Sequence, residues 1–266
     1  MTRPTLQQIR HRLSRLSLTR ATVVALVAAT TTALSALIAF AVTVEDVTSH
    51  NGLATTDGRH LRWFTTHRTG ALVNAAKAFT DIGSVATLAF VTVAAGILLW
   101  RHGAKLALAA TPLLSLVFAG MLAGAVKAMV NRTRPPASLH LVNESNASFP
   151  SGHATDSTAT LVAIALVVAV AVCHRTQLRA LVVAAAGLLS AAIGWSRLEL
   201  GVHWPTDVLA GWALGLLVAI IVTTLATATT HLTPPQHPNR TTGWERLRAT
   251  AIQLTNARRP RLQRST

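Results

Sequence analysis

Long apolar stretches constrain this chain more than any other feature of its sequence. Each is close to the roughly 20 residues that a helix needs to cross the hydrocarbon core of a bilayer. There are six of them: 21–44, 83–100, 106–126, 157–173, 180–195 and 208–229. Hydrocarbon offers backbone groups no hydrogen-bond partners, so such runs must be helical. We therefore expect an all-α, polytopic membrane protein with six transmembrane helices.

Composition agrees with a membrane protein. Apolar residues make up 51% of the chain and charged residues only 12%, against about 25% charged in a soluble domain. The net charge of +15 would also suit nucleic-acid binding. However, the basic residues gather at the two chain ends and in short connections, not in one stripe. We therefore expect no nucleic-acid partner.

Two Gly-x-x-x-Gly patterns lie inside apolar stretches, at Gly120/Gly124 and at Gly211/Gly215. Small residues at this spacing let two helix backbones approach closely in a membrane. We expect helix packing at both pairs.

The placement of lysine and arginine predicts the orientation, because these residues concentrate in cytoplasmic segments. With a cytoplasmic N-terminus, the cytoplasmic segments hold 16 of the 24 basic residues and only one of the nine acidic residues. Six spans then place both termini in the cytoplasm. We expect a basic tail over residues 1–20, a membrane domain over 21–230 and a basic, disordered tail over 231–266. Both tails would bind anionic lipid of the inner leaflet.

This orientation brings two distant segments to the outer face. One connects the third and fourth spans, and the other connects the fifth and sixth. Together they carry three cations, two histidines and one carboxylate: Lys127, Arg134, His153, Arg197, His203 and Asp207. Such a concentration at one membrane face favours a binding site for an anion.

Lys127 and Arg134 are seven residues apart, which is nearly two helical turns. If the third span continues outward as far as Arg134, both side chains share one face. Pro135 would end the helix there. Two cations on one face suit a doubly charged anion, although cations that snorkel from a helix end would give the same pattern.

Ser151, Gly152 and His153 precede the fourth span. Ser151 suits a helix N-cap, and Gly152 allows backbone to approach a ligand closely. Free N–H groups at a helix N-terminus bind phosphate, and His153 beside them could transfer a proton. The alternative is an ordinary cap followed by an exposed histidine.

His203 and Asp207 flank Pro205, which favours the first turn of a helix. Asp207 then points back toward His203. A carboxylate bonded to one ring nitrogen leaves the other nitrogen free to attack. The alternatives are a surface histidine with a first-turn aspartate, and an Arg197 that only offsets the C-terminal dipole of the fifth helix.

Three ordered blocks of the sequence resemble the tripartite signature of the type 2 phosphatidic acid phosphatase superfamily. They are Lys127-x6-Arg134-Pro135, Pro150-Ser151-Gly152-His153 and Ser196-Arg197-x5-His203-x3-Asp207. The resemblance covers residues 64–229. It implies a six-span membrane enzyme with its active site at the extracytoplasmic face.

The resemblance also implies a role for each residue. His203 would be the nucleophile, Asp207 its orienting partner, and His153 the acid and then the base. The phosphate would be bound by Lys127, Arg134, Ser151, Gly152 and Arg197. Neither metal nor cofactor is expected, because three fixed cations can neutralise a transferred phosphoryl group.

The implied reaction is hydrolysis of a lipid phosphomonoester or pyrophosphate through a phosphohistidine. Candidate substrates are phosphatidic acid, phosphatidylglycerol phosphate and polyprenyl diphosphates such as undecaprenyl diphosphate. A lipid phosphotransferase would have the same sequence features. A vanadium-dependent haloperoxidase shares the cradle but is typically soluble, and a lipid carrier would not need the intact catalytic set. The composition suggests a bacterial inner membrane, while the lipid and the oligomeric state stay open.

Overall fold

The computed structural model describes residues 20–173 and 175–232, and all regular structure in these segments is helical. The all-α expectation is therefore confirmed for this part of the chain. The two basic tails, and with them the predicted contact with inner-leaflet lipid, lie almost wholly outside the described residues.

Within the described residues, five helices are long and apolar enough to cross a membrane by themselves. They are α2 (Arg20–Thr48), α6 (Leu106–Val130), α7 (Gly152–Ala171), α8 (Thr176–Glu199) and α9 (Pro205–Leu232). Two shorter helices, α4 (Gly70–Ile82) and α5 (Val85–Arg101), meet the same criterion only when taken together, and they meet at a bend of 53°, so this pair is the candidate for a sixth span. The protein is thus a multi-pass membrane protein. The predicted second span, 83–100, corresponds to α5 alone.

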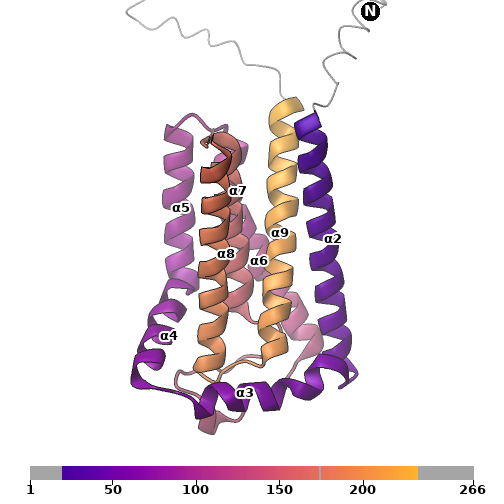
Figure 1. Ribbon diagram of the computed structural model, residues 1–266, viewed down its shortest axis with the longest axis vertical. Coiled ribbons are helices and arrows are strands. Elements are labelled where there is room, and N and C mark those ends of the chain that lie inside the picture. Colours follow the sequence, from indigo (N-terminus) through magenta and orange to yellow (C-terminus); the bar gives the residue numbers. More distant parts are fainter. Residues whose placement is uncertain (1–19, 174, 233–266) are drawn as a thin grey trace, which may run out of the picture. The chain divides into compact units, whose positions relative to one another are not determined.

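The segment between α2 and α4 contains two short helices, η1 (Gly52–Thr56) and α3 (Asp57–Thr66). Another short helix, η2 (Ala137–Leu139), lies in the connection between α6 and α7. Figure 1 shows α3 running across the end of the bundle at which α8 ends and α9 begins, and α3 contacts α8 there. This end of the bundle holds the predicted site residues.

The fourth span begins earlier than its apolar stretch. Helix α7 begins at Gly152, whereas the sequence predicted residue 157. The prediction was late because the first two turns are rich in polar side chains, which are nevertheless buried. These include Thr155, Asp156 and Ser157. A search for apolar residues stops where such side chains begin, even though the helix continues.

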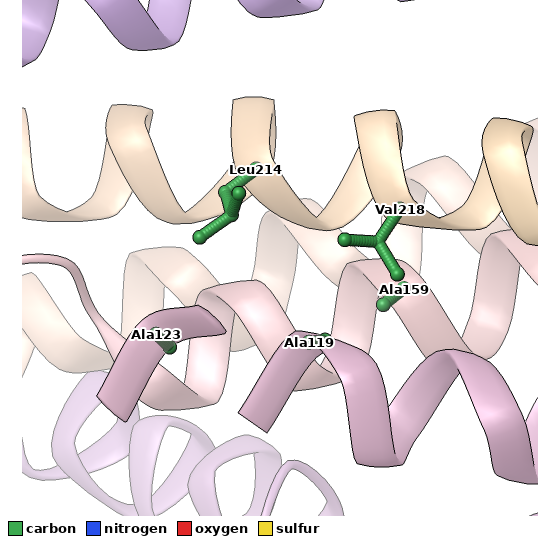
Figure 2. Close-up of a cluster of buried hydrophobic side chains, with 5 residues drawn as sticks. All are labelled: Ala119, Ala123, Ala159, Leu214 and Val218. Atoms are coloured by element: carbon green, nitrogen blue, oxygen red, sulfur yellow. The ribbon is translucent and has the colours of Figure 1, made fainter. Parts of the chain in front are cut away.

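Small residues bring α6, α7 and α9 into contact. Their shared cluster is drawn in Figure 2 and consists of Ala119 and Ala123 from α6, Ala159 from α7, and Leu214 and Val218 from α9. Helices α7 and α9 approach closely at Gly215, where an added Cβ would lie 2.4 Å from the carbonyl oxygen of Thr155.

The two Gly-x-x-x-Gly pairs behave differently. A Cβ at Gly211 would lie 2.8 Å from that of Ala154, so the prediction of helix packing at Gly211/Gly215 is confirmed. A Cβ at Gly120 would have its nearest neighbour 3.8 Å away, and one at Gly124 would meet nothing within 4 Å. Among the described residues, Gly120 therefore allows only an ordinary contact with Asp156 of α7, and the approach at Gly120/Gly124 is less close than at Gly211/Gly215.

Candidate active site

The predicted site residues come from four helix ends that meet at one end of the bundle. Lys127 lies in the last turn of α6, Arg197 in the last turn of α8, and Asp207 in the first turn of α9. Ser151 is the N-cap of α7, which begins with Gly152 and His153. Arg134 and His203 lie in the connections before α7 and before α9.

His203 is positioned by a tight turn between α8 and α9. Gly201 has a φ of +73°, and an added Cβ would lie 2.3 Å from the carbonyl oxygen of Leu139. Both facts require glycine. Two residues later, Nδ1 of His203 lies 3.2 Å from Oδ2 of Asp207, as the sequence spacing predicted. Both side chains are fully buried.

The second ring nitrogen of His203 faces a cation. Nη1 of Arg134 lies 3.2 Å from Nε2. A guanidinium can only donate, so Nε2 accepts, and the ring proton must lie on Nδ1, facing Asp207. Burial and the charges of Arg197, Arg134 and Lys127 hold the pKa of His203 well below its ordinary value, against a hydrogen bond to the backbone of Ser148. The ring is therefore neutral, with its unprotonated nitrogen on the side of the cations.

Arg134 and Arg197 share one carboxylate, that of Glu144. Oε2 of Glu144 lies 3.2 Å from Nη2 of Arg134, and Oε1 accepts a hydrogen bond from Nη2 of Arg197. An anion thus already sits between two of the predicted phosphate-binding residues. The sequence analysis missed Glu144, although it is the sole acidic residue in 131–151.

Arg197 is 1% exposed, so it is not a surface cation at a helix end. Its Nη1 donates to the hydroxyl of Thr80 on α4. Its Nε has no hydrogen-bond partner within the described segments. A buried guanidinium with unused donor capacity is suited to an anionic ligand.

Lys127 and Arg134 do not share a helical face, contrary to the sequence-based prediction. Helix α6 ends at Val130, and Asn131 adopts a left-handed conformation with a φ of +44°. Pro135 therefore does not end the helix, and the chain carries Arg134 into the site as part of a loop. Lys127 nevertheless interacts electrostatically with Arg134, and its Nζ donates to the carbonyl of Ala147 at 2.6 Å.

Ser151 occupies the N-cap position of α7, but its side chain makes no capping hydrogen bond. Its hydroxyl is buried and, among the described residues, has no hydrogen-bond partner. Its backbone N–H donates to the carbonyl oxygen of Asp207 at 3.0 Å, which ties the start of α7 to the first turn of α9. A Cβ at Gly152 would meet nothing within 4 Å, so there is open space beside this backbone.

His153 is half-buried rather than exposed. It interacts electrostatically with both Arg197 and His203, which places it on the same side of the bundle as the cations. An added Cβ at Gly83, at the bend between α4 and α5, would lie 3.4 Å from Cδ2 of His153. The two predicted histidines therefore belong to one site.

Two charged residues that the sequence analysis used only for orientation also reach the site. Arg132 donates from Nη1 to Oδ1 of Asp207 and from Nη2 to Oδ2 of Asp57, both at 2.7 Å.

The described part of the chain contains no group of three or more His, Cys, Asp or Glu side chains arranged to hold a metal ion.

Comparisons with known proteins match the region of the chain that contains these residues. Residues 108–230 match the family model of the PAP2 superfamily. Over 97 residues the chain is 37% identical to phosphatidylglycerophosphatase B of Bacillus subtilis, which is 36% of this chain and 47% of that protein. It is 35% identical over 123 residues to lipid A 1-phosphatase of Rhizobium etli, covering 40% of this chain and 47% of that protein. The chain thus spans about half the length of the curated relatives that it matches.

The fold also matches a solved structure, that of a transmembrane PAP2-type phosphatidylglycerolphosphate phosphatase from Bacillus subtilis. The TM-score is 0.67 at 24% identity, over 77% of this chain and 98% of that one. At this identity the match concerns the fold alone. The family model covers all three sequence blocks of the site, so residues 108–230 of this chain are similar to the PAP2 superfamily.

Proposed function

We propose that this protein is a membrane phosphatase that hydrolyses a phosphomonoester or pyrophosphate of a lipid through a phosphohistidine on His203. The arrangement of His203 carries the proposal. One ring nitrogen is held by a buried carboxylate, and the other lies 3.2 Å from a guanidinium. The site thus combines a neutral nucleophile with cations that can bind the phosphate oxygens and so hold the phosphorus atom beside the nucleophile.

The phosphate would take the place of the Glu144 carboxylate. Hydrogen bonds that involve a charged group contribute about 1.5–3 kcal/mol each, and a phosphate dianion makes more of them than a carboxylate. Its oxygens would bind Lys127, Arg134 and Arg197, together with the Ser151 hydroxyl and the Gly152 backbone. The unpartnered Ser151 Oγ and Arg197 Nε support this assignment.

In the first half-reaction, Nε2 of His203 attacks phosphorus and the bond from phosphorus to the lipid oxygen breaks. His153 protonates the leaving oxygen, so that the lipid alcohol or lipid monophosphate departs. The positive charge that develops on the imidazole of His203 is stabilised by Asp207. The guanidiniums neutralise charge on the equatorial oxygens of the transferred phosphoryl group.

In the second half-reaction, water attacks the phosphohistidine. His153, now neutral, takes a proton from the water as its oxygen bonds to phosphorus. The bond between phosphorus and Nε2 breaks, inorganic phosphate leaves, and Glu144 can return to the two arginines. Three fixed cations provide the charge neutralisation, so we expect hydrolysis without a metal ion or other cofactor.

A lipid substrate is supported by the position of the site and by the relatives. The cradle lies where membrane-spanning helices end, within reach of a lipid head group. The two curated relatives are named as phosphatases of lipids. Phosphatidic acid, phosphatidylglycerol phosphate and undecaprenyl diphosphate are the substrates to compare.

The proposed location is the cell membrane, with both termini cytoplasmic and the active site extracytoplasmic. The charge distribution supports it, because cytoplasmic segments attract lysine and arginine. Figure 1 shows the start of α2 and the end of α9 at one end of the bundle and α3 at the other. The site would then face the outer leaflet.

The test is a panel of these lipids, given to the purified protein in detergent with excess EDTA, with released phosphate as the readout. We expect at least one lipid to be hydrolysed, and vanadate to inhibit. Activity that EDTA abolishes and Mg²⁺ restores would contradict the charge argument. Phosphoryl transfer to an added lipid alcohol, with little free phosphate, would identify a phosphotransferase instead.

A further inference from the structure

Arg132 holds two buried carboxylates at once. Its Nη1 donates to Oδ1 of Asp207 and its Nη2 to Oδ2 of Asp57, each at 2.7 Å. Asp207 is 0% exposed and Asp57 is 2% exposed. A buried carboxylate is stable only with a cation or several hydrogen bonds around it. A single guanidinium therefore contacts both carboxylates.

Asp57 fixes the position of that guanidinium. It is the first residue of α3, the short helix across the end of the bundle. Thr206, next to Asp207, donates to Asp57 from its backbone N–H at 3.0 Å and from its hydroxyl at 2.5 Å. Arg132 also donates to that hydroxyl oxygen at 2.7 Å. These contacts join α3, the end of α6 and the first turn of α9.

The arrangement uses both oxygens of Asp207. Oδ2 accepts from the backbone N–H of Trp204 at 2.9 Å and faces Nδ1 of His203 at 3.2 Å. Oδ1 accepts from Arg132. The plane of the carboxylate is thereby fixed, and with it the plane of the imidazole that it orients.

Arg132 also affects the protonation of His203. Without Arg132, the buried carboxylate of Asp207 would lack this cation. The imidazole of His203 could take its place by accepting a proton at Nε2, because the imidazolium would carry a positive charge. That proton would occupy the lone pair that has to attack phosphorus. The charge of Arg132 favours the ionised form of Asp207 and disfavours a second proton on His203.

We propose that Asp57 and Arg132 are positioning residues for the nucleophile: they act on His203 through Asp207 and keep its Nε2 unprotonated. The inference rests on the proposed function, because it concerns the residue that would attack phosphorus. It extends the site beyond the three sequence blocks, to a residue of the segment between the first two spans.

The first test compares Arg132→Ala with the exposed-site control Arg62→Ala. We expect Arg132→Ala to lower kcat roughly 10- to 100-fold, the range found when partners that orient metal-bound imidazoles are removed, with little change in KM. The acid limb of its kcat/KM profile should move to higher pH. Other groups near His203 stay in place in this variant, namely the cations Lys127, Arg134 and Arg197 and the titratable side chain of His153.

The second test is chemical rescue. Arg132 is 16% exposed at its side chain, and it lines a cavity of about 650 Å³ together with Thr133 and Trp204. Guanidinium ion should enter through this cavity, restore part of kcat in Arg132→Ala, and move the acid limb back. It should not stimulate the wild type or Arg62→Ala.

The third test adds Asp57→Asn to Arg132→Ala. This double variant contains neither buried charge of the Asp57–Arg132 pair, so it should melt at a higher temperature than Arg132→Ala in detergent. It should remain as slow as Arg132→Ala, and guanidinium should rescue it less. If Arg132→Ala does not fold, the pH dependence of kcat/KM is measured on the double variant instead.

The outcomes separate the inference from the proposed function. A wild-type protein that hydrolyses no lipid phosphate contradicts the proposed function. An active wild type with variants of equal kcat overturns the inference. So does a loss of activity in which the acid limb stays in place and guanidinium has no effect, since that describes a purely structural role.

Discussion

The carboxylate of Glu144 accepts a hydrogen bond from the guanidinium of Arg197, although the two residues are 53 positions apart. Glu144 lies in the connection between α6 and α7, and Arg197 in the last turn of α8. The same carboxylate contacts Arg134. Without a ligand, the proposed cradle therefore holds an anion of the protein itself, and a phosphate has to displace it.

Replacing Glu144 should tighten binding of a phosphate analogue. In Glu144→Gln the competing negative charge is lost, so we expect the Kd for vanadate to fall about tenfold, equivalent to about 1.4 kcal/mol. Inhibition of hydrolysis or direct calorimetry would measure it. Glu45→Gln, at an exposed acidic position, is the control. Weaker binding in Glu144→Gln would mean that Glu144 organises the two arginines for the ligand.

The two histidines should fail in different ways. His203→Ala should abolish both turnover and the phosphoenzyme, because no other group takes the place of Nε2. His153→Ala should slow cleavage of an alkyl phosphate by roughly 100- to 10,000-fold. The loss should be smaller for p-nitrophenyl phosphate, whose leaving group needs little protonation. Rapidly quenched samples analysed by mass spectrometry at neutral pH would detect the adduct, and a phosphoryl group on His153 would reverse the assignment.

His203 should stay neutral through the physiological pH range. Burial and the charges of Arg197, Arg134 and Lys127 hold its pKa well below the ordinary value, so protonation requires a lower pH than for a free imidazole. In protein labelled with ¹³C-histidine, the resonance of His203 can be identified because it is absent from His203→Gln. This resonance should not shift between pH 8 and pH 6. In Arg134→Gln, His203 has one positive charge fewer beside it, so the titration midpoint of His203 should move to higher pH. A wild-type midpoint near pH 6.5 would contradict this.

Gly215 should be more sensitive to alanine than Gly187, another glycine within a spanning helix. Its Cβ would lie 2.4 Å from the Thr155 carbonyl oxygen, whereas a Cβ at Gly187 would meet nothing within 4 Å. Overpacking typically costs 1–3 kcal/mol, so we expect roughly that loss of stability for Gly215→Ala. Melting in detergent would measure it. Gly187→Ala should melt at or above the wild-type temperature, since alanine favours helix.

The proposed orientation can be tested with single cysteines in a Cys173→Ala background. Ser145 lies in the α6–α7 connection and His102 at the end of α5, and both are exposed. In intact cells, an impermeant maleimide should label Ser145→Cys, whereas His102→Cys should react only after lysis. Labelling in the reverse pattern would invert the proposed topology.

The sequence predicted most of the fold, because apolar length is a strong signal for a spanning helix. It did not predict the bend between α4 and α5, which falls at Gly83 and Ser84, or the polar start of α7. Buried Thr155 and Asp156 look like loop residues when only hydrophobicity is considered. Tertiary contacts decided these boundaries.

Within the site, the sequence predicted local geometry where residues are close in the chain. The contact between His203 and Asp207 follows from a spacing of four at a helix start, and the structure has it. Lys127 and Arg134 were placed on one helical face, but Asn131 ends that helix first. Glu144 and Asp57 were missed because their partners lie far along the chain, where spacing carries no information.

The bond between Thr80 and Arg197 has a practical consequence for protein engineering. The region that matches the family begins at residue 108, yet Thr80 accepts a hydrogen bond from this fully buried arginine. A chimera that grafts only the matched region onto the first helices of another protein would leave Arg197 short of an acceptor. Donor segments for such exchanges should therefore be chosen to carry a hydroxyl at the position of Thr80, as well as the three signature blocks.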